Sequence, residues 1–250
     1  MNWHLIETGE NTGNFNMEFD LELVKHCTDN DAFFRLYRWK PYCISLGANQ
    51  SLGDIAIKAS SEANIDIVKR PTGGRAILHA EEITYSVVLP YSLELSAKDI
   101  YKKISLALIR GMEHYNPLLC ESELENIQPN FHEILKTDSG ILCFGSAAKN
   151  EVKFKGKKII GSAQRKLNHA VLQHGSILCG PAHKKLVNFL KVPSDVKRKL
   201  ADEISEKTTE IESILNAQVD YNKLSECLIK GFEETWQTTL ERNFSLCEHI

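Results

Sequence analysis

The bend Arg70-Pro-Thr-Gly-Gly-Arg75 combines two adjacent glycines with basic side chains. Glycine adopts positive φ without strain and lets another molecule approach the backbone closely. Because Lys69, Arg70 and Arg75 surround the bend, it could receive an anion or a polarised carbonyl group. The alternative is a plain hairpin turn with solvated arginines, which spacing alone favours because Gly-Gly turns are common.

A second segment, Lys158-Ile-Ile-Gly-Ser-Ala-Gln164, places Gly161 and Ser162 inside a predicted strand. Residues this small leave room for a ligand beside the sheet. In an extended chain Lys157 and Lys158 face opposite sides, so only one of them can point inward, and the pattern does not choose between them. A lysine pair on an exposed edge strand is the alternative interpretation.

Cys143 ends an apolar run and precedes four small residues, Gly145-Ser-Ala-Ala148. An accessible loop thiol near positive charge is a candidate nucleophile. Most free cysteines are buried, however, so a core position is the more common outcome for an isolated thiol. His174 is a weaker candidate, because a lone strand histidine is more often a structural hydrogen-bonding residue than a base.

Composition excludes several classes of protein. The 250 residues carry 30 Lys and Arg against 33 Asp and Glu, and 42% of them are hydrophobic, which is typical of a globular domain. The charges form no basic footprint, so no nucleic-acid partner is predicted. No stretch approaches the roughly 18 apolar residues of a membrane helix and the first residues do not resemble a signal peptide, so we expect a cytoplasmic protein with no membrane partner.

The seven cysteines are scattered and form no C-x-x-C pair. This spacing predicts neither a disulfide framework nor a thiolate metal site, and most of these cysteines are expected to be small buried residues.

Hydrophobic periodicity predicts an α+β protein of mixed and antiparallel sheets flanked by helices, with further helices at the C-terminal end. Ser96 is placed to cap the most regular helix, and Lys155 and Gly156 are placed to turn a hairpin. The predicted strands span residues 2–6, 32–39, 43–47, 65–70, 76–79, 83–90, 141–144, 151–166 and 169–179. The predicted helices span residues 16–26, 97–115, 182–191, 194–205 and 221–240.

Three motifs, KRPTGGRAILHAEEITYSV, GKKIIGSAQRK and LQHGSIL, occur in an order that resembles the lipoate- and octanoate-handling branch of the biotin/lipoate protein ligase superfamily. The resemblance extends over about residues 16–190. It implies a catalytic domain of the biotin/lipoate protein ligase type in residues 1–190, with residues 191–250 as a helical C-terminal extension packed on the same domain.

Within the superfamily, the sequence is most similar to the LipM-type octanoyltransferases, which move an octanoyl group from acyl carrier protein to a lipoyl domain or the glycine cleavage H protein. These enzymes carry a Cys-Phe pair fifteen residues before a strand lysine. The resemblance therefore implies Cys143 as the acyl-accepting nucleophile and Lys158 as the inward lysine beside it. By the same correspondence, the acyl site is implied to comprise Arg70, Gly73, Gly74, Arg75, His79, Gly161, Ser162, Ala163 and Gln164.

A thioester donor is already activated, so this reaction requires no cofactor and no metal. Three alternatives remain: a lipoate-protein ligase, which would need ATP and Mg²⁺, a LipL-type amidotransferase, and a non-catalytic module that binds acylated proteins. The presence of both Cys143 and Lys158 favours transfer over ligation or binding alone, because only acyl transfer through a thioester needs the thiol.

Overall fold

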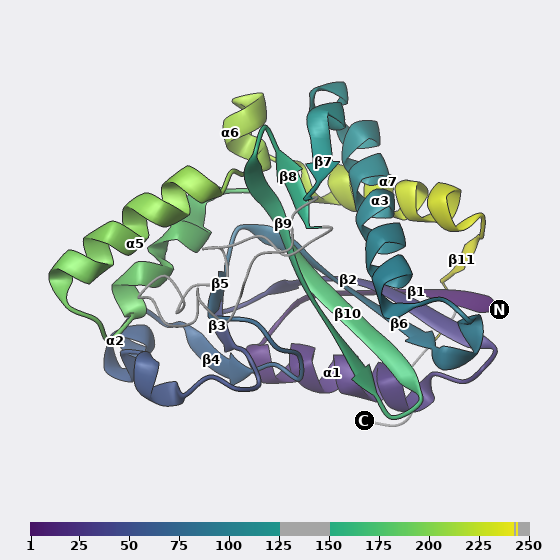
Figure 1. The fold of residues 1–250 in the computed structure, drawn as a ribbon, viewed down its shortest axis with the longest axis horizontal. Coiled ribbons are helices and arrows are strands. Elements are labelled where there is room, and N and C mark those ends of the chain that lie inside the picture. The colour runs from purple at the N-terminus through teal and green to yellow at the C-terminus, as the bar shows by residue number, and fades with distance from the viewer. Residues whose placement is uncertain (126–150, 243, 245–250) are drawn as a thin grey trace.

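The computed structural model describes residues 1–125, 151–242 and 244, which form two β-sheets with helices packed around them (Figure 1). The larger sheet is mixed: β1 pairs in parallel with β2 and β11, and the remaining neighbours are antiparallel. Its order is β11 (Leu240–Glu241), β1 (Asn2–Asn11), β2 (Asp31–Trp39), β6 (Glu82–Pro90), β10 (Ala170–Leu178), β9 (Lys157–Leu167), β8 (Val152–Phe154) and β7 (Ser122–Leu124). The smaller sheet has the order β4 (Asp66–Lys69), β3 (Cys43–Leu46) and β5 (Ile77–His79).

Helices cover both faces of the larger sheet. On one face α3 (Ala97–Tyr115) and α7 (Tyr221–Trp236) pack together, and their apolar residues share a core with alternate residues of the central strands, such as Phe34 and Tyr85. On the other face α1 (Gly13–His26) packs against the side chains that point the opposite way, including Phe33 and Val88. This alternation between two cores follows from the period of two along a strand.

The smaller sheet has its own core with the segments that follow β10. That core joins β3 and β5 to η6, a 3-10 helix over Pro181–Phe189, and to α5 (Ser194–Lys207). The remaining helical elements are η1 (Leu52–Asp54), α2 (Ile57–Glu62), η2 (Tyr91–Leu93), η3 (Pro117–Glu121) and α6 (Ile211–Leu215). In Figure 1 the small sheet, α2 and α5 lie at the end of the molecule away from α3 and α7.

Most predicted elements are confirmed. Ser96 caps α3 by accepting a hydrogen bond from the Asp99 backbone N–H, and Lys155 and Gly156 turn the β8–β9 hairpin with positive φ angles of 48° and 79°. The helix predicted over residues 182–191 is instead the 3-10 helix η6. Its apolar spacing correctly indicated a helix, but it does not distinguish i→i+3 from i→i+4 hydrogen bonding.

Other boundaries and elements differ from the prediction. The first strand continues to Asn11, the last predicted helix ends at Trp236 with Gln237 in the left-handed region, and α2 and α6 were not predicted. The strand predicted over residues 141–144 lies outside the described residues. None of the helices in the described ranges is long and apolar enough to cross a membrane.

The expectation that most cysteines are buried holds for three of those the structure describes. Cys27, Cys43 and Cys179 are buried, Cys227 is half-buried and Cys120 is exposed. All five are free thiols.

Candidate functional site

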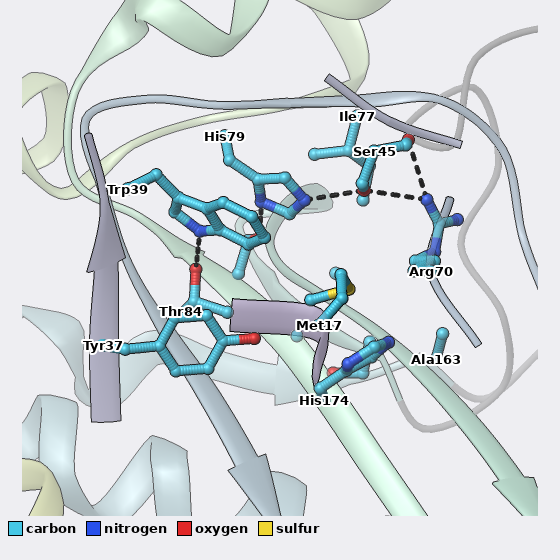
Figure 2. A pocket seen from close by; sticks show the side chains of 14 residues that line it. Met17, Tyr37, Trp39, Ser45, Arg70, Ile77, His79, Thr84, Ala163 and His174 are labelled. Carbon is cyan, nitrogen blue, oxygen red and sulfur yellow. Dashed lines mark hydrogen bonds between the residues drawn. The ribbon is translucent and has the colours of Figure 1, made fainter. Parts of the chain in front are cut away.

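A narrow pocket with a free volume of about 20 Å³, room for about one water molecule, lies where the smaller sheet and α1 meet one face of the larger sheet (Figure 2). It draws side chains from both sheets, so the chain must be fully folded to form it. Its lining residues are Met17, Tyr37, Trp39, Ser45, Arg70, Ile77, His79, Thr84, Gly161, Ser162, Ala163, His174, Gly175 and Ser176.

One wall of the pocket is a hydrogen-bonded group around His79. Its Nδ1 donates to Glu82 Oε1 over 2.8 Å, its Nε2 lies 2.7 Å from Ser45 Oγ, and its ring stacks on Trp39 with centroids 4.1 Å apart. Thr84 and Ser176 donate their hydroxyl hydrogens to the same Glu82 oxygen. Burial alone would raise the pKa of Glu82, but the charge and hydrogen bond of His79 and the two hydroxyl donors lower it overall.

A second buried group lies around His174. Its Nδ1 donates to Asp20 Oδ2 over 3.1 Å, and Thr72 Oγ1 lies 2.6 Å from its Nε2. Burial outweighs the attraction of Asp20 and lowers the pKa of His174, so the ring is neutral near pH 7 and Thr72 donates to it. With both ring nitrogens occupied, His174 is the structural hydrogen-bonding residue that the sequence favoured.

Arg70 shapes the glycine bend from inside. Its guanidinium donates to the backbone carbonyl and hydroxyl oxygens of Ser45 and to the carbonyl oxygens of Gly73 and Arg75, which uses all five of its N–H groups. The bend is therefore neither a plain hairpin nor a turn with a solvated arginine at position 70. Because these hydrogen bonds of Arg70 go to protein oxygens, the basic groups left to face an anion at the bend are the exposed Lys69 and the half-buried Arg75.

The backbone requires glycine at only one of the two glycines in the bend. Gly74 has φ of 95°, which favours glycine, whereas a Cβ on Gly73 would meet open space. Gly47 lies so close that an added Cβ would fall 2.0 Å from the Gly74 carbonyl oxygen. The bend is thus pressed backbone to backbone against the loop that follows β3.

These hydrogen bonds determine what the pocket offers to a ligand. Although hydroxyls, imidazoles and an arginine line it, each side-chain nitrogen and oxygen of these lining residues already has a protein partner. The side chains therefore present carbon to the interior of the pocket. Such a wall suits an alkyl chain better than a charged group.

The small residues of β9 divide between the two faces of the sheet. Gly161 and Ala163 pair with Ser176 and His174 and share their pocket face. The Ser162 hydroxyl instead bonds Tyr85 on the opposite face, and Gln164 donates to the Ala97 carbonyl oxygen and to Gln173 there. Gln164, predicted as a site residue, thus anchors the start of α3 and is absent from the pocket lining.

Lys158 is the inward-pointing lysine. Its side chain is 2% exposed, whereas Lys157 is exposed and reaches the Ser205 carbonyl oxygen. The Lys158 ammonium lies 2.8 Å from Glu151 Oε1, and the same oxygen accepts the Ser162 backbone N–H over 3.4 Å. Lys158 does not line the pocket itself, but this shared oxygen places its charge at the Ser162 end of it.

Glu151 was not identified from the sequence. A buried lysine requires a counter-charge, and this would have directed attention to the nearest carboxylates along the chain. Cys143 and the small-residue loop 145–148 lie outside the described residues, so the role of that thiol stays a prediction. Within the ranges that the structure covers, no group of three or more His, Cys, Asp or Glu side chains is arranged to hold a metal ion.

Comparison with known proteins gives consistent matches along the chain. Residues 12–233 match the model of the lipoyl protein ligase A/B catalytic domain. The octanoyltransferase LipM of Kyrpidia tusciae is 34% identical over 246 residues, covering 96% of this chain and 89% of that protein. The octanoyltransferase LipM of Clostridioides difficile is 31% identical over 239 residues, covering 93% of this chain and 86% of that protein.

Solved structures with the same fold are more distant in sequence. The bipartite lipoate protein ligase of Thermoplasma acidophilum superposes with a TM-score of 0.77 at 20% identity, over 98% of this chain and 88% of that one. A lipoate-protein ligase A bound with ATP superposes with a TM-score of 0.74 at 20% identity, over 98% and 90% of the two chains. At these identities the likeness establishes the α+β fold alone.

Proposed function

This chain belongs to the lipoyl protein ligase A/B catalytic domain family and is an acyltransferase, and we propose that it transfers an octanoyl group to a lipoyl-domain protein. In this proposal the donor is octanoyl-acyl carrier protein, and the acceptor is the lysine of a lipoyl domain or of the glycine cleavage H protein. The similarity to octanoyltransferases over nearly the whole chain supports the reaction class.

The observation that carries the proposal is a carbon-lined pocket whose Ser162 backbone N–H is linked to the buried Lys158 ammonium through Glu151 Oε1. Burying seven carbons of an octanoyl chain is worth about 5 to 6 kcal/mol before ordering costs. In this proposal the pocket widens from its free volume of about 20 Å³ to take the chain, and the acyl carbonyl then lies near Ser162 and Lys158.

The proposed reaction has two steps. The Cys143 thiolate attacks the carbonyl carbon of the donor thioester, the bond from that carbon to the carrier sulfur breaks, and the carrier thiolate takes up the proton that Cys143 released, which gives octanoyl-Cys143. The acceptor lysine amine then attacks this thioester, loses a proton, and forms the amide while Cys143 regains its thiol. Neither step consumes ATP.

Lys158 contributes most, in this proposal, by stabilising the oxyanion that forms on the acyl carbonyl in both steps. Lowering a thiol pKa by about two units raises the thiolate fraction about 25-fold at neutral pH but reduces intrinsic nucleophilicity about eightfold. The net gain is only about threefold, whereas loss of one oxyanion donor typically costs about 10² to 10³ in rate.

Transfer and ligation are separated by a direct assay of the purified protein with an apo lipoyl domain. Octanoyl-acyl carrier protein without ATP is expected to give octanoylated domain, while free octanoate with ATP and Mg²⁺ gives none. Product from the second mixture alone would identify a ligase. Product from neither would exclude both and leave the amidotransferase, which takes its acyl group from the glycine cleavage H protein, or a protein that only binds acylated partners.

Met17 on α1 is expected to limit the length of the acyl chain. It is 7% exposed and lines the pocket, so Met17→Ala should open space for longer chains. Two further methylene groups are worth about 1.6 kcal/mol, so the rate with decanoyl donor relative to octanoyl donor should rise about tenfold. Leu21→Ala, on the exposed side of the same helix, is the control and should leave this ratio unchanged. An unchanged ratio in Met17→Ala would show that the chain binds elsewhere.

A further inference from the structure

The ion pair between Lys158 and Glu151 is buried on both sides. Their side chains are 2% and 3% exposed, and the Nζ to Oε1 distance is 2.8 Å. By contrast, Lys155 in the β8–β9 turn and Glu121 at the end of η3 form a pair of similar length, 3.0 Å, with both side chains more than half exposed. The chain thus offers a buried pair and an exposed pair for comparison.

Burial makes the charge state of Lys158 depend on its partner. An ammonium taken out of water loses its proton readily unless an anion compensates it. An uncharged Lys158 could not stabilise a developing oxyanion by charge. Any group that keeps Lys158 protonated therefore acts on the reaction without touching the substrate.

Glu151 also determines where the ammonium points. Its backbone carbonyl accepts the Glu125 N–H over 2.8 Å, which fixes the residue beside the end of β7. Its Oε1 accepts the backbone N–H of Ser162, a pocket residue, as well as the Lys158 ammonium. One oxygen therefore aligns Lys158 with the end of the pocket at which the acyl carbonyl is proposed to lie.

We propose that Glu151 is a positioning residue for acyl transfer, which holds the Lys158 ammonium charged and directed at the Ser162 end of the pocket. This inference rests on the proposed function, because it assigns Glu151 its role through Lys158.

Three titratable side chains lie near Lys158 in the part of the chain that the structure describes. Lys153 lies opposite it on β8 and is ion-paired with Glu125. His183 bonds Thr208, the residue that bridges to the Lys158 backbone, and burial lowers its pKa to about 4. Tyr85 bonds Ser162, and burial raises its pKa to about 12.

The test is the pH profile of octanoyl-Cys143 formation, measured by mass spectrometry of the intact protein after mixing with octanoyl-acyl carrier protein. In wild type the rate should hold or rise from pH 6.5 to 8.5 as the thiol ionises. In Glu151→Gln the lysine lacks the Glu151 carboxylate and holds its proton less tightly, so the rate of the variant relative to wild type should fall about tenfold between pH 6.5 and 8.5. Glu151→Asp should restore much of the wild-type profile.

Two comparisons separate this effect from damage to the fold. Glu121→Gln removes the exposed pair and should keep the wild-type profile. In a Lys158→Met background, Glu151→Gln should no longer change the shape of the profile, because the titrating lysine is gone. A Glu151→Gln profile parallel to wild type, whatever the thermal stability, would overturn the positioning role and leave the proposed function intact. Absence of acyl-enzyme in wild type would instead overturn the proposed function.

Discussion

Lys158→Met should lower the rate of acyl-enzyme formation about 10² to 10³-fold, because it removes a charged donor from the developing oxyanion. Lys157→Met is the matched control, because Lys157 is exposed and points away from Lys158 on β9. The rate of this variant should stay within about twofold of wild type. Single-turnover acylation followed by intact mass measures both.

Lys158→Met removes the ammonium that faces the buried Glu151 carboxylate, which threatens the fold as well as the reaction. The double variant Lys158→Met with Glu151→Gln removes both charges and should be equally slow while recovering stability. The pH dependence then identifies the role of the lysine. If alkaline pH fully restored the rate of Lys158→Met, its task would be to ionise the thiol rather than to stabilise an oxyanion.

Asp20→Asn should lower the free energy of unfolding by about 3 to 5 kcal/mol, because it leaves Arg35 as a buried, uncompensated charge. Both side chains are fully buried, and Arg35 Nη1 lies 2.7 Å from Asp20 Oδ1. Urea unfolding measures the loss as a shift of midpoint at constant slope. Asp20 also accepts a hydrogen bond from His174, which in turn bonds Thr72 of the glycine bend. The rate of acyl-enzyme formation should therefore fall too.

Asp20→Asn should also change how the free energy of unfolding depends on pH in acid. Burial raises the pKa of Asp20, but Arg35 and the hydrogen bonds of His174 and Ser86 lower it overall. Its stabilising effect is therefore complete above the ordinary carboxyl pKa and is lost as pH falls through the lowered value. Asp20→Asn should flatten stability below about pH 4. The control Glu10→Gln breaks a half-exposed ion pair with Arg38 and should lower the free energy of unfolding by less than about 1 kcal/mol. An equal loss of stability in Asp20→Asn and Glu10→Gln would contradict the stabilising role of the buried pair.

Local patterns predicted the elements that local physics determines. Ser96 and the apolar stripe after it specify α3, and Lys155-Gly156 specifies a tight turn. Strand alternation showed that one of Lys157 and Lys158 must point inward, although the residues alone did not identify which one. The separation of β3, β4 and β5 into a second sheet was not predicted, because strand pairing over such distances leaves no local pattern.

The sequence identified the segments that form the site but not the hydrogen bonds and ion pairs between them. His174 and Asp20 are 154 positions apart, so nothing local indicates that they share a hydrogen bond. Arg70 was expected to face a ligand, and only the fold shows that its N–H groups all bind the protein. Glu151 was missed for the same reason, because a counter-ion is recognised only once the lysine is known to be buried.

The proposed reaction requires a covalent octanoyl group at Cys143, which intact-protein mass spectrometry detects after mixing with octanoyl-acyl carrier protein and no acceptor. We expect wild type and Cys120→Ser, which removes an exposed thiol, to gain one octanoyl group that hydroxylamine releases. Cys143→Ser should gain no such hydroxylamine-labile thioester. An adduct that persists in Cys143→Ser at the wild-type rate, or octanoylated lipoyl domain made by that variant at the wild-type rate, would contradict the account.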